Sequence, residues 1–340
     1  MIVKNILIIR LSAIGDVVFA SPLIKALRRS YPDAKISWLV ESAAAPLLRQ
    51  NAELDEVIVW PKDEWKQLWQ ERKFFTLWRA YRRFKRAFRA RRFDTALDLQ
   101  GLMKSAVWAR ASGAETRIGL GSKERSEHMM TQVISRQGGG ARIGSEYYAF
   151  AQELGLDVAG FEMDIALSDE DDTFPARTLE HQAYAVVCPF TTRPQKHWLE
   201  SRWPPLIEQI QAEQSLPVVM LGGPADVAAA ERIAAECGSL TNLVGQSSLT
   251  QTAAVIKHAS LLVGVDTGLT HMGIAFNVPT VALFGSTCPY TDTTRDNAVV
   301  LYHKMACSPC RRHPSCEGDF TCMKKISVDE VMQTVRQVRR

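Results

Sequence analysis

The segment Leu261-Leu-Val-Gly-Val-Asp266-Thr-Gly-Leu-Thr-His271-Met-Gly-Ile-Ala275 decides the fold of this chain. Five apolar residues end abruptly at Asp-Thr-Gly, and apolar residues then recur at helical spacing. This pattern predicts a buried strand, a tight turn and a helix. The unpaired N–H groups at the start of such a helix form a ready site for an anion. The ionisable and hydroxyl side chains of the turn are Asp266, Thr267, Thr270 and His271.

Similar strand-like and helix-like segments alternate along the whole chain. The short apolar runs cover residues 6–9, 36–40, 57–60, 96–99, 184–188, 218–221, 261–265 and 280–284, and helix-length segments such as 20–29 and 104–111 lie between them. This alternation predicts an α/β protein with parallel sheets covered on both faces. A polar, acidic stretch at 168–175 divides the series in two. We therefore expect two doubly wound domains, 1–170 and 180–326, and a closing helix over 327–340.

The composition is that of an ordinary globular protein that is too long for a single core. The chain has 340 residues, 46% hydrophobic and 23% charged, and its net charge of +4 is too small to imply a nucleic-acid partner. The apolar start of the chain is interrupted at Arg10, which is unlike a secretory signal. No run approaches the ~20 apolar residues of a membrane span. These features predict a cytoplasmic protein.

The first motif, Arg10-Leu-Ser-Ala-Ile-Gly15-Asp16, follows the first predicted strand and precedes a helix. One interpretation makes Asp16 a general base that faces a ligand cleft. The alternative makes Asp16 an N-cap, which stabilises a helix by ~1 kcal/mol. Both interpretations stay open on the motif alone.

A second motif, Asp98-Leu-Gln100-Gly101-Leu-Met-Lys104-Ser105, also lies at a strand end. Its polar groups are suited to sugar hydroxyls or to an anionic acceptor. The alternative is a plain strand-to-helix turn in which Gly101 has a special backbone angle.

Two more motifs occur in the second half of the chain. In Thr191-Thr192-Arg-Pro-Gln-Lys196-His-Trp198, Lys196 is a point charge suited to a phosphate, and the two threonines are hydroxyl donors. In Gly222-Gly-Pro-Ala-Asp226, the carboxylate is suited to a ribose, although a turn with a capping Asp explains it equally well. No Gly-x-Gly-x-x-Gly follows the first strand and no Walker loop occurs, which argues against a dehydrogenase and a P-loop enzyme.

Residues 72–92 hold ten Lys or Arg side chains and a series of aromatic residues. The aromatic residues recur three and four positions apart, at Phe74, Trp78, Tyr81, Phe84 and Phe88. Such a helix can lie on an anionic membrane surface. Alternatively, the aromatic stripe packs on its own domain and the charges remain solvated.

Four cysteines, Cys307, Cys310, Cys316 and Cys322, fall within one loop-like segment. A Cys-x-x-Cys pair and two further thiolates are able to complete a tetrahedral site for structural zinc or iron. The second pair is spaced by five residues, which fits zinc-ribbon spacing imperfectly. Reduced thiols without a metal and a redox disulfide remain the alternatives.

Taken together, the ordered motifs resemble glycosyltransferase family 9, the lipopolysaccharide heptosyltransferases. The resemblance rests on the motifs ending at Asp16, Ser105, Trp198 and His271, and the second motif is most like that of the enzyme adding the first heptose. It implies a GT-B fold, in which two Rossmann-like domains face a central cleft. It further implies inverting transfer of heptose from ADP-L-glycero-D-manno-heptose to a Kdo or inner-core lipopolysaccharide acceptor, without a catalytic cofactor. The expected partners are the ADP-heptose donor, a Kdo-lipid A type acceptor and, through peripheral contact, the cytoplasmic face of the inner membrane.

The resemblance also assigns roles to residues of this chain. Asp16 would be the catalytic base. The residues implied in donor binding are Thr191, Thr192, Lys196, Asp226, Asp266, Thr267, Gly268 and His271; those implied in acceptor binding are Ser12, Gln100, Lys104 and Arg125. A GT-B transferase for another nucleotide sugar, a sugar epimerase and a binding protein without turnover are the competing hypotheses.

Overall fold

The structure is a computed structural model and describes residues 4–122, 124–136, 140–287, 290–310 and 313–339. The chain forms two compact units, one up to residue 166 and one from Leu167 onward. The second unit also includes the short stretch 140–143, because Ile143 N donates to the Asp292 carbonyl at 2.7 Å.

The first unit contains a parallel sheet of six strands in the order β3-β2-β1-β4-β5-β6. Its strands are β1 (Asn5–Ile9), β2 (Lys35–Glu41), β3 (Glu56–Trp60), β4 (Thr95–Asp98), β5 (Thr116–Leu120) and β6 (Gln132–Ile134). Its helices are α1 (Ile14–Ala20), α2 (Pro22–Ser30), α3 (Lys62–Gln70), α4 (Phe74–Arg89), α5 (Met103–Ser112) and α6 (Ser145–Glu153), with the short 3₁₀ turns η1 (Ala45–Leu47) and η2 (Ser126–Met129).

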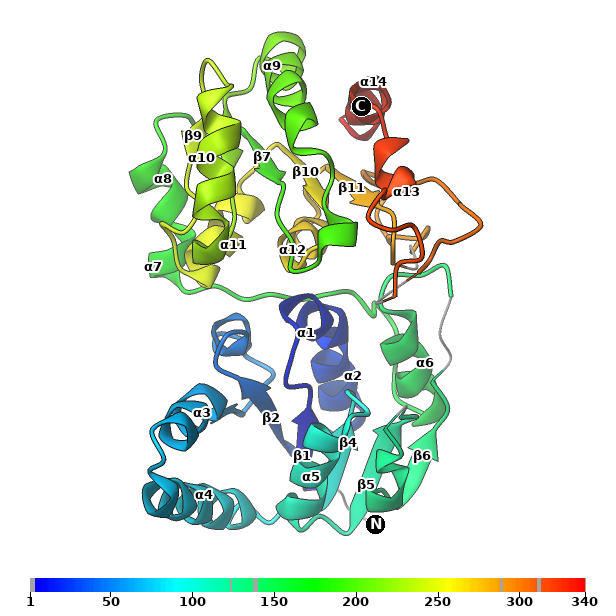
Figure 1. Ribbon diagram of the computed structural model, residues 1–340. Helices are drawn as coiled ribbons and strands as arrows, with labels where there is room; N and C mark the ends of the chain where they lie inside the picture. Colours follow the sequence, from blue (N-terminus) through cyan, green and yellow to red (C-terminus); the bar gives the residue numbers. More distant parts are fainter. Residues whose placement is uncertain (1–3, 123, 137–139, 288–289, 311–312, 340) are drawn as a thin grey trace. The chain divides into compact units, whose positions relative to one another are not determined.

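The strands of this sheet are apolar on both sides because helices cover both faces. Ile6 and Ile8 pack with residues of α1, α2 and α6, whereas Leu7 and Ile9 pack with Phe88 of α4 and with α5. Figure 1 shows these helices around the sheet. A continuous apolar run is therefore the sequence pattern of a strand buried in this way.

The second unit repeats this topology, with the strand order β12-β11-β10-β7-β8-β9. Its strands are β7 (Ala185–Cys188), β8 (Val218–Met220), β9 (Thr241–Asn242), β10 (Leu261–Val265), β11 (Thr280–Phe284) and β12 (Ala298–Tyr302). Its helices are α7 (Asp169–Asp172), α8 (Phe174–Thr178), α9 (Trp203–Gln214), α10 (Val227–Ala235), α11 (Leu249–Lys257), α12 (Gly268–Ala275), α13 (Thr321–Lys324) and α14 (Val328–Val338). Three 3₁₀ turns complete it: η3 (Pro194–Lys196), η4 (Glu200–Arg202) and η5 (Pro224–Asp226).

Each sheet has one point at which its strand order reverses. The reversal falls between β1 and β4 in the first unit and between β7 and β10 in the second. In open α/β sheets, ligands bind beyond the carboxyl ends of the strands at this switch point. The topology therefore predicts a site after β1 and β4, and another after β7 and β10.

The expected strands and the α/β fold class are confirmed, with shifts of about one residue at the ends of several strands. The helix expected over 20–29 is confirmed as α2, which starts at Pro22 because α1 ends at Ala20 and the two helices meet at Ser21. Pro22 has no N–H and starts α2, and the Ser21 hydroxyl donates to the Val18 carbonyl at 2.7 Å. Within the described residues, no helix is long and apolar enough to cross a membrane.

Candidate active site

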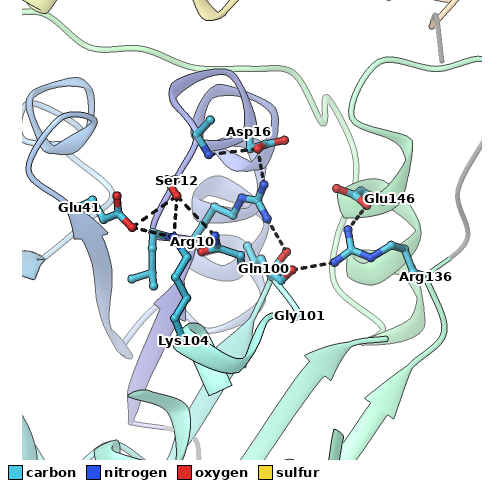
Figure 2. Close-up of polar contacts among 12 residues, drawn as sticks. Arg10, Ser12, Asp16, Glu41, Gln100, Gly101, Lys104, Arg136 and Glu146 are labelled. Carbon is cyan, nitrogen blue, oxygen red and sulfur yellow. Dashed lines mark hydrogen bonds and ion pairs between the residues drawn. The ribbon is translucent and has the colours of Figure 1, made fainter. Parts of the chain in front are cut away.

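Asp16 lies in the first turn of α1, directly after the turn that follows β1. Its carboxylate accepts a hydrogen bond from Ala13 N at 3.1 Å and pairs with Arg10 Nη2 at 2.5 Å (Figure 2). The N-cap of α1 is Ala13, so the interpretation of Asp16 as the N-cap is corrected: its side chain folds back from the third helical position. The Asp16 side chain is 38% exposed, which leaves the carboxylate accessible to a ligand.

Arg10, the ion-pair partner of Asp16, is buried, with 7% of its side chain exposed. Its Nη1 donates to the Leu99 carbonyl at 3.2 Å, and its guanidinium lies 5.8 Å from the centre of the Tyr147 ring. Burial alone would lower the pKa of Arg10, but neighbouring acidic groups, including Asp16, raise it above its ordinary value. Arg10 is therefore a permanent cation beside the carboxylate.

The turn after β4 is fixed by a buried carboxylate. Asp98 accepts hydrogen bonds from Gln100 N at 3.0 Å, Gly101 N at 3.1 Å and the Ser105 hydroxyl at 3.0 Å. Burial raises the pKa of Asp98, and these hydrogen bonds oppose that rise. Gly101 has φ +62°, and a Cβ there would lie 2.8 Å from the Leu120 carbonyl oxygen. This motif is thus a tight turn that also carries the polar side chains of Gln100 and Lys104.

Three of the four predicted acceptor residues form one hydrogen-bonded group, which includes a residue that the sequence did not single out. Lys104 Nζ donates to Ser12 Oγ at 3.1 Å and to Glu41 Oε1 at 2.8 Å. Gln100 accepts from Leu11 N at 3.0 Å, and its amide lies 3.5 Å from Ser12 Oγ. Glu41 ends β2, the neighbour of β1, and Figure 2 shows it beside Ser12 and Lys104.

The fourth predicted acceptor residue, Arg125, lies apart from these hydrogen bonds on an exposed loop. It adopts a left-handed conformation, φ +56°, just before η2. The loop is tied to α5 through the preceding residue, Glu124, which accepts from Met103 N at 2.7 Å. Arg125 thus stands near the start of the helix that carries Lys104.

In the second unit, Asp266 is the centre of the site after β10. Its carboxylate pairs with Lys196 Nζ at 2.7 Å, accepts from the Thr287 hydroxyl at 2.5 Å and lies 3.3 Å from His271 Nε2. Burial alone would raise the pKa of Asp266, but the His271 hydrogen bond and the Lys196 charge hold that pKa well below its ordinary value. Asp266 is therefore ionised and fixes Lys196 beside the start of α12.

The threonine hydroxyl groups on the turns after β7 and β10 differ in their burial. Thr270 is fully buried and donates to the Val265 carbonyl at 2.6 Å, so its hydroxyl is used within the fold. Thr191 donates to the Asp266 carbonyl at 3.2 Å. Thr267 is the N-cap of α12 but makes no side-chain cap, and Gly268 follows it as the first helical residue. Thr192 follows Thr191 in the chain and is exposed on the turn after β7.

His271 is buried behind the turn, with 5% of its side chain exposed. Its Nε2 faces Asp266, and its Nδ1 lies 2.9 Å from the Tyr290 hydroxyl. The ring therefore orients the carboxylate from within the fold.

Asp226 lies after β8, the strand beside β7. One of its carboxylate oxygens accepts from Gly223 N at 2.8 Å and closes the turn. A Cβ at Gly222 would lie 2.6 Å from the Phe190 ring, which explains the glycine there. The turn interpretation holds for this motif, and the Asp226 side chain remains partly exposed.

The four cysteines of the tail differ in their exposure to solvent. Among the described residues, no group of three or more His, Cys, Asp or Glu side chains is placed to hold a metal ion. Cys307 is exposed, whereas Cys322 points into the core, where its Sγ would lie 2.8 Å from a Cβ at Gly285. Burial, and after it the neighbouring tail cysteines, raises the pKa of the Cys310 and Cys322 thiols. The described residues thus show no formed site for structural zinc or iron, and metal binding by the tail stays a prediction.

Four residues contact the predicted site residues but were not predicted from the sequence to do so: Arg10, Glu41, Thr287 and Tyr290. Glu41 is the last residue of β2 and Thr287 follows β11, and these two strands neighbour the switch-point strands. Their position at strand ends was the signal available in the sequence.

Two doubly wound units, each with a polar group at its switch point, define the GT-B class of glycosyltransferase folds. Residues 81–320 match the family described as "Glycosyltransferase family 9 (heptosyltransferase)". Lipopolysaccharide heptosyltransferase 1 of Pseudomonas aeruginosa is 30% identical over 317 residues, which cover 90% of this chain and 86% of that protein. The protein of the same name from Salmonella typhimurium is 28% identical over 293 residues, 84% of this chain and 89% of that protein. The chain belongs to glycosyltransferase family 9, and it is a transferase.

Solved structures agree on the fold. The ADP-heptose lps heptosyltransferase II of Escherichia coli has a TM-score of 0.77 at 22% identity, covering 99% of this chain and 98% of that one. The E. coli heptosyltransferase WaaC with ADP has a TM-score of 0.75 at 23% identity, covering 98% of this chain and 100% of that one. The resemblance found in the sequence motifs is therefore confirmed for family and fold.

Proposed function

We propose that this chain transfers heptose from ADP-L-glycero-D-manno-heptose to a Kdo or inner-core lipopolysaccharide acceptor, with inversion at the anomeric carbon. The observation that carries the proposal is the pair of switch-point sites, one built around an accessible carboxylate and the other around a fixed lysine at a helix start. Relatives named lipopolysaccharide heptosyltransferase 1 support the choice of donor sugar and acceptor class.

The second unit would bind the donor. A diphosphate leaving group gains negative charge in the transition state, and preorganised donors stabilise that charge without reorganisation. Lys196, the hydroxyls of Thr191, Thr192 and Thr267, and the N–H groups from Gly268 onward would supply them. Asp266 and His271 would hold Lys196 in place, and Asp226 would lie beside the ribose.

The first unit would bind the acceptor and activate it. Asp16 would take the proton of the acceptor hydroxyl. At the same time the oxygen of that hydroxyl would attack the anomeric carbon, and the bond from this carbon to the ADP oxygen would break. Ser12, Gln100, Lys104 and Arg125 would hold the sugar hydroxyls and the acidic groups of the acceptor. Transfer requires the hydroxyl and the anomeric carbon to meet, so closure of the two units is part of the proposal. The lipid acceptor implies peripheral contact with the cytoplasmic face of the inner membrane.

The proposal is tested with a panel of donors and acceptors and mass detection of the product. ADP-heptose and GDP-, UDP- and ADP-hexoses would each be offered with Kdo-lipid A and with a heptose-extended core. We expect a single heptose added to one of the two acceptors from ADP-heptose. A product formed only from another nucleotide sugar would point to a different transferase, and nucleotide-sugar binding without any product would point to a binding protein.

A further inference from the structure

The hairpin of α3 and α4 carries large aromatic side chains that the fold leaves in solvent. Trp69 is 63% exposed, Phe74 51%, Phe75 68% and Trp78 50%. All four lie within ten positions around the turn that joins the two helices, and Figure 1 shows this hairpin at one edge of the first unit. Exposed aromatic residues gathered in this way mark an interaction surface.

Core packing accounts for the other half of α4 but not for this end. Tyr81, Phe84 and Phe88 lie 6.3, 5.1 and 5.6 Å from Trp108 between ring centres, and Phe88 is fully buried. Trp69 and Phe74 instead contact each other at 5.1 Å, and Phe75 stacks on Trp78 at 6.0 Å. The aromatic stripe thus divides: its C-terminal part packs on its own unit, as one interpretation predicted, and its N-terminal part does not.

Cations surround the exposed aromatic rings. Residues 69–89 hold eight Lys or Arg and a single acidic residue, Glu71, which pairs with Lys73 at 2.7 Å. The Arg82 guanidinium lies 4.8 Å from the Trp78 ring centre, and that of Arg79 lies 5.9 Å from Phe75. An anionic bilayer has an apolar interior, which suits the aromatic side chains, and phosphate headgroups, which suit the cationic side chains.

We propose that the α3–α4 hairpin is a docking site for an anionic lipid bilayer. Trp69, Phe74, Phe75 and Trp78 enter the boundary between headgroups and acyl chains, and the arginines of α4 bind lipid phosphates. The large excess of positive charge favours a phospholipid surface over a protein partner or a second copy of this chain. The inference deepens the proposed function, since it names the surface by which an enzyme with a lipid-linked acceptor reaches it.

The test is co-sedimentation of the full chain with vesicles, without donor or acceptor. We compare vesicles of phosphatidylcholine alone with vesicles that also contain phosphatidylglycerol. The chain should bind the anionic vesicles about tenfold or more tightly. Phe75→Ser with Trp78→Ser should weaken that binding about tenfold, and Arg82→Gln with Arg86→Gln should reduce the preference for anionic lipid. The matched control is Val107→Ser with Val227→Ser, which replaces two exposed apolar residues on other helices and should bind as the original chain does.

Equal binding to both vesicle types, or anionic binding that the aromatic replacements leave unchanged, would overturn the proposal. The proposal would also be overturned if the chain did not bind vesicles and instead formed a dimer in solution that dissociates on the aromatic replacements. An Asp16→Asn chain should still bind vesicles, so failure of the docking proposal and failure of the proposed transfer reaction are observed separately.

Discussion

Asp16 owes its position to a buried cation rather than to burial of its own carboxylate. The Arg10 guanidinium is anchored to the Leu99 carbonyl and pairs with Asp16 at 2.5 Å. Arg10 would not touch the acceptor in the proposed reaction, and we assign it as a positioning residue. A base that works by position depends on such support, because misplacement by about 1 Å can lower a rate ~100-fold.

Replacing Arg10 by Met should lower kcat about 10- to 100-fold, because Asp16 loses the group that orients it. The KM for the donor should stay the same, since Arg10 lies in the other unit. Arg10→Lys should restore part of the rate by keeping the charge. Steady-state kinetics on the three proteins check this, and a change confined to donor KM would contradict the positioning role.

Replacing Lys196 by Gln should weaken donor binding ~10- to 100-fold, the magnitude of a lost charge-assisted hydrogen bond. Calorimetric titration with ADP measures the effect, and Lys257→Gln, a change at a lysine that pairs with Asp172 in the same unit, is the control. An unchanged affinity for ADP would remove Lys196 from the phosphate site.

The same variant should be more sensitive to acid. The pKa of Asp266 in the folded chain lies below its ordinary value of 3.8, so its ionisation stabilises the fold above that pH. This stabilisation is lost as the pH falls through the folded pKa. Without the Lys196 charge the depression is smaller, and the acid-unfolding midpoint, followed by circular dichroism, should move to higher pH. A midpoint that stays in place or moves to lower pH would contradict this coupling.

At the scale of elements, the junction of β10 and α12 depends on close approach of backbone and side chain. A Cβ at Gly264 would lie 2.3 Å from the Thr270 hydroxyl and 2.9 Å from the Cys188 Cβ. The glycine therefore lets the first turn of α12 sit directly on the strand. The position of the proposed diphosphate site follows from this contact.

Gly264→Ala should destabilise the chain by ~1–3 kcal/mol, the usual effect of overpacking a core. It should also weaken ADP binding, because displacement of Thr270 shifts the start of α12. Denaturant unfolding and calorimetric titration measure the two effects. Gly238→Ala is the control, since nothing lies within 4 Å of a Cβ there, and equal stability of the two variants would contradict the argument.

The sequence was informative about elements because a strand buried on both faces is a continuous apolar run. Asp16, Lys196 and Asp266 were predicted for the related reason that they lie in the segments that follow such runs. Their partners were not found, because Glu41 and Thr287 come from neighbouring strands and sequence spacing does not show strand order. The inward direction of Thr270 and His271 was missed because it depends on the rotation of α12 about its axis, which a short turn does not reveal.

At the scale of the whole molecule, core packing holds one of the four tail cysteines and so disfavours a site made of all four thiolates. Cys322 and Met323 are buried in the core of the second unit beside Gly285. Chain purified without chelator should therefore contain well under one equivalent of zinc or iron by elemental analysis. Stoichiometric metal that is lost when Cys307 and Cys310 are replaced by Ser would contradict this.

In the proposed reaction the second unit holds the donor and the first unit supplies the base. The most direct test is Asp16→Asn, assayed for heptose transfer and for ADP-heptose binding on the same protein. We predict that transfer falls by ~10²–10⁴ while the donor dissociation constant is unchanged. Transfer close to that of the original chain, or loss of donor binding in parallel with loss of transfer, would contradict the account.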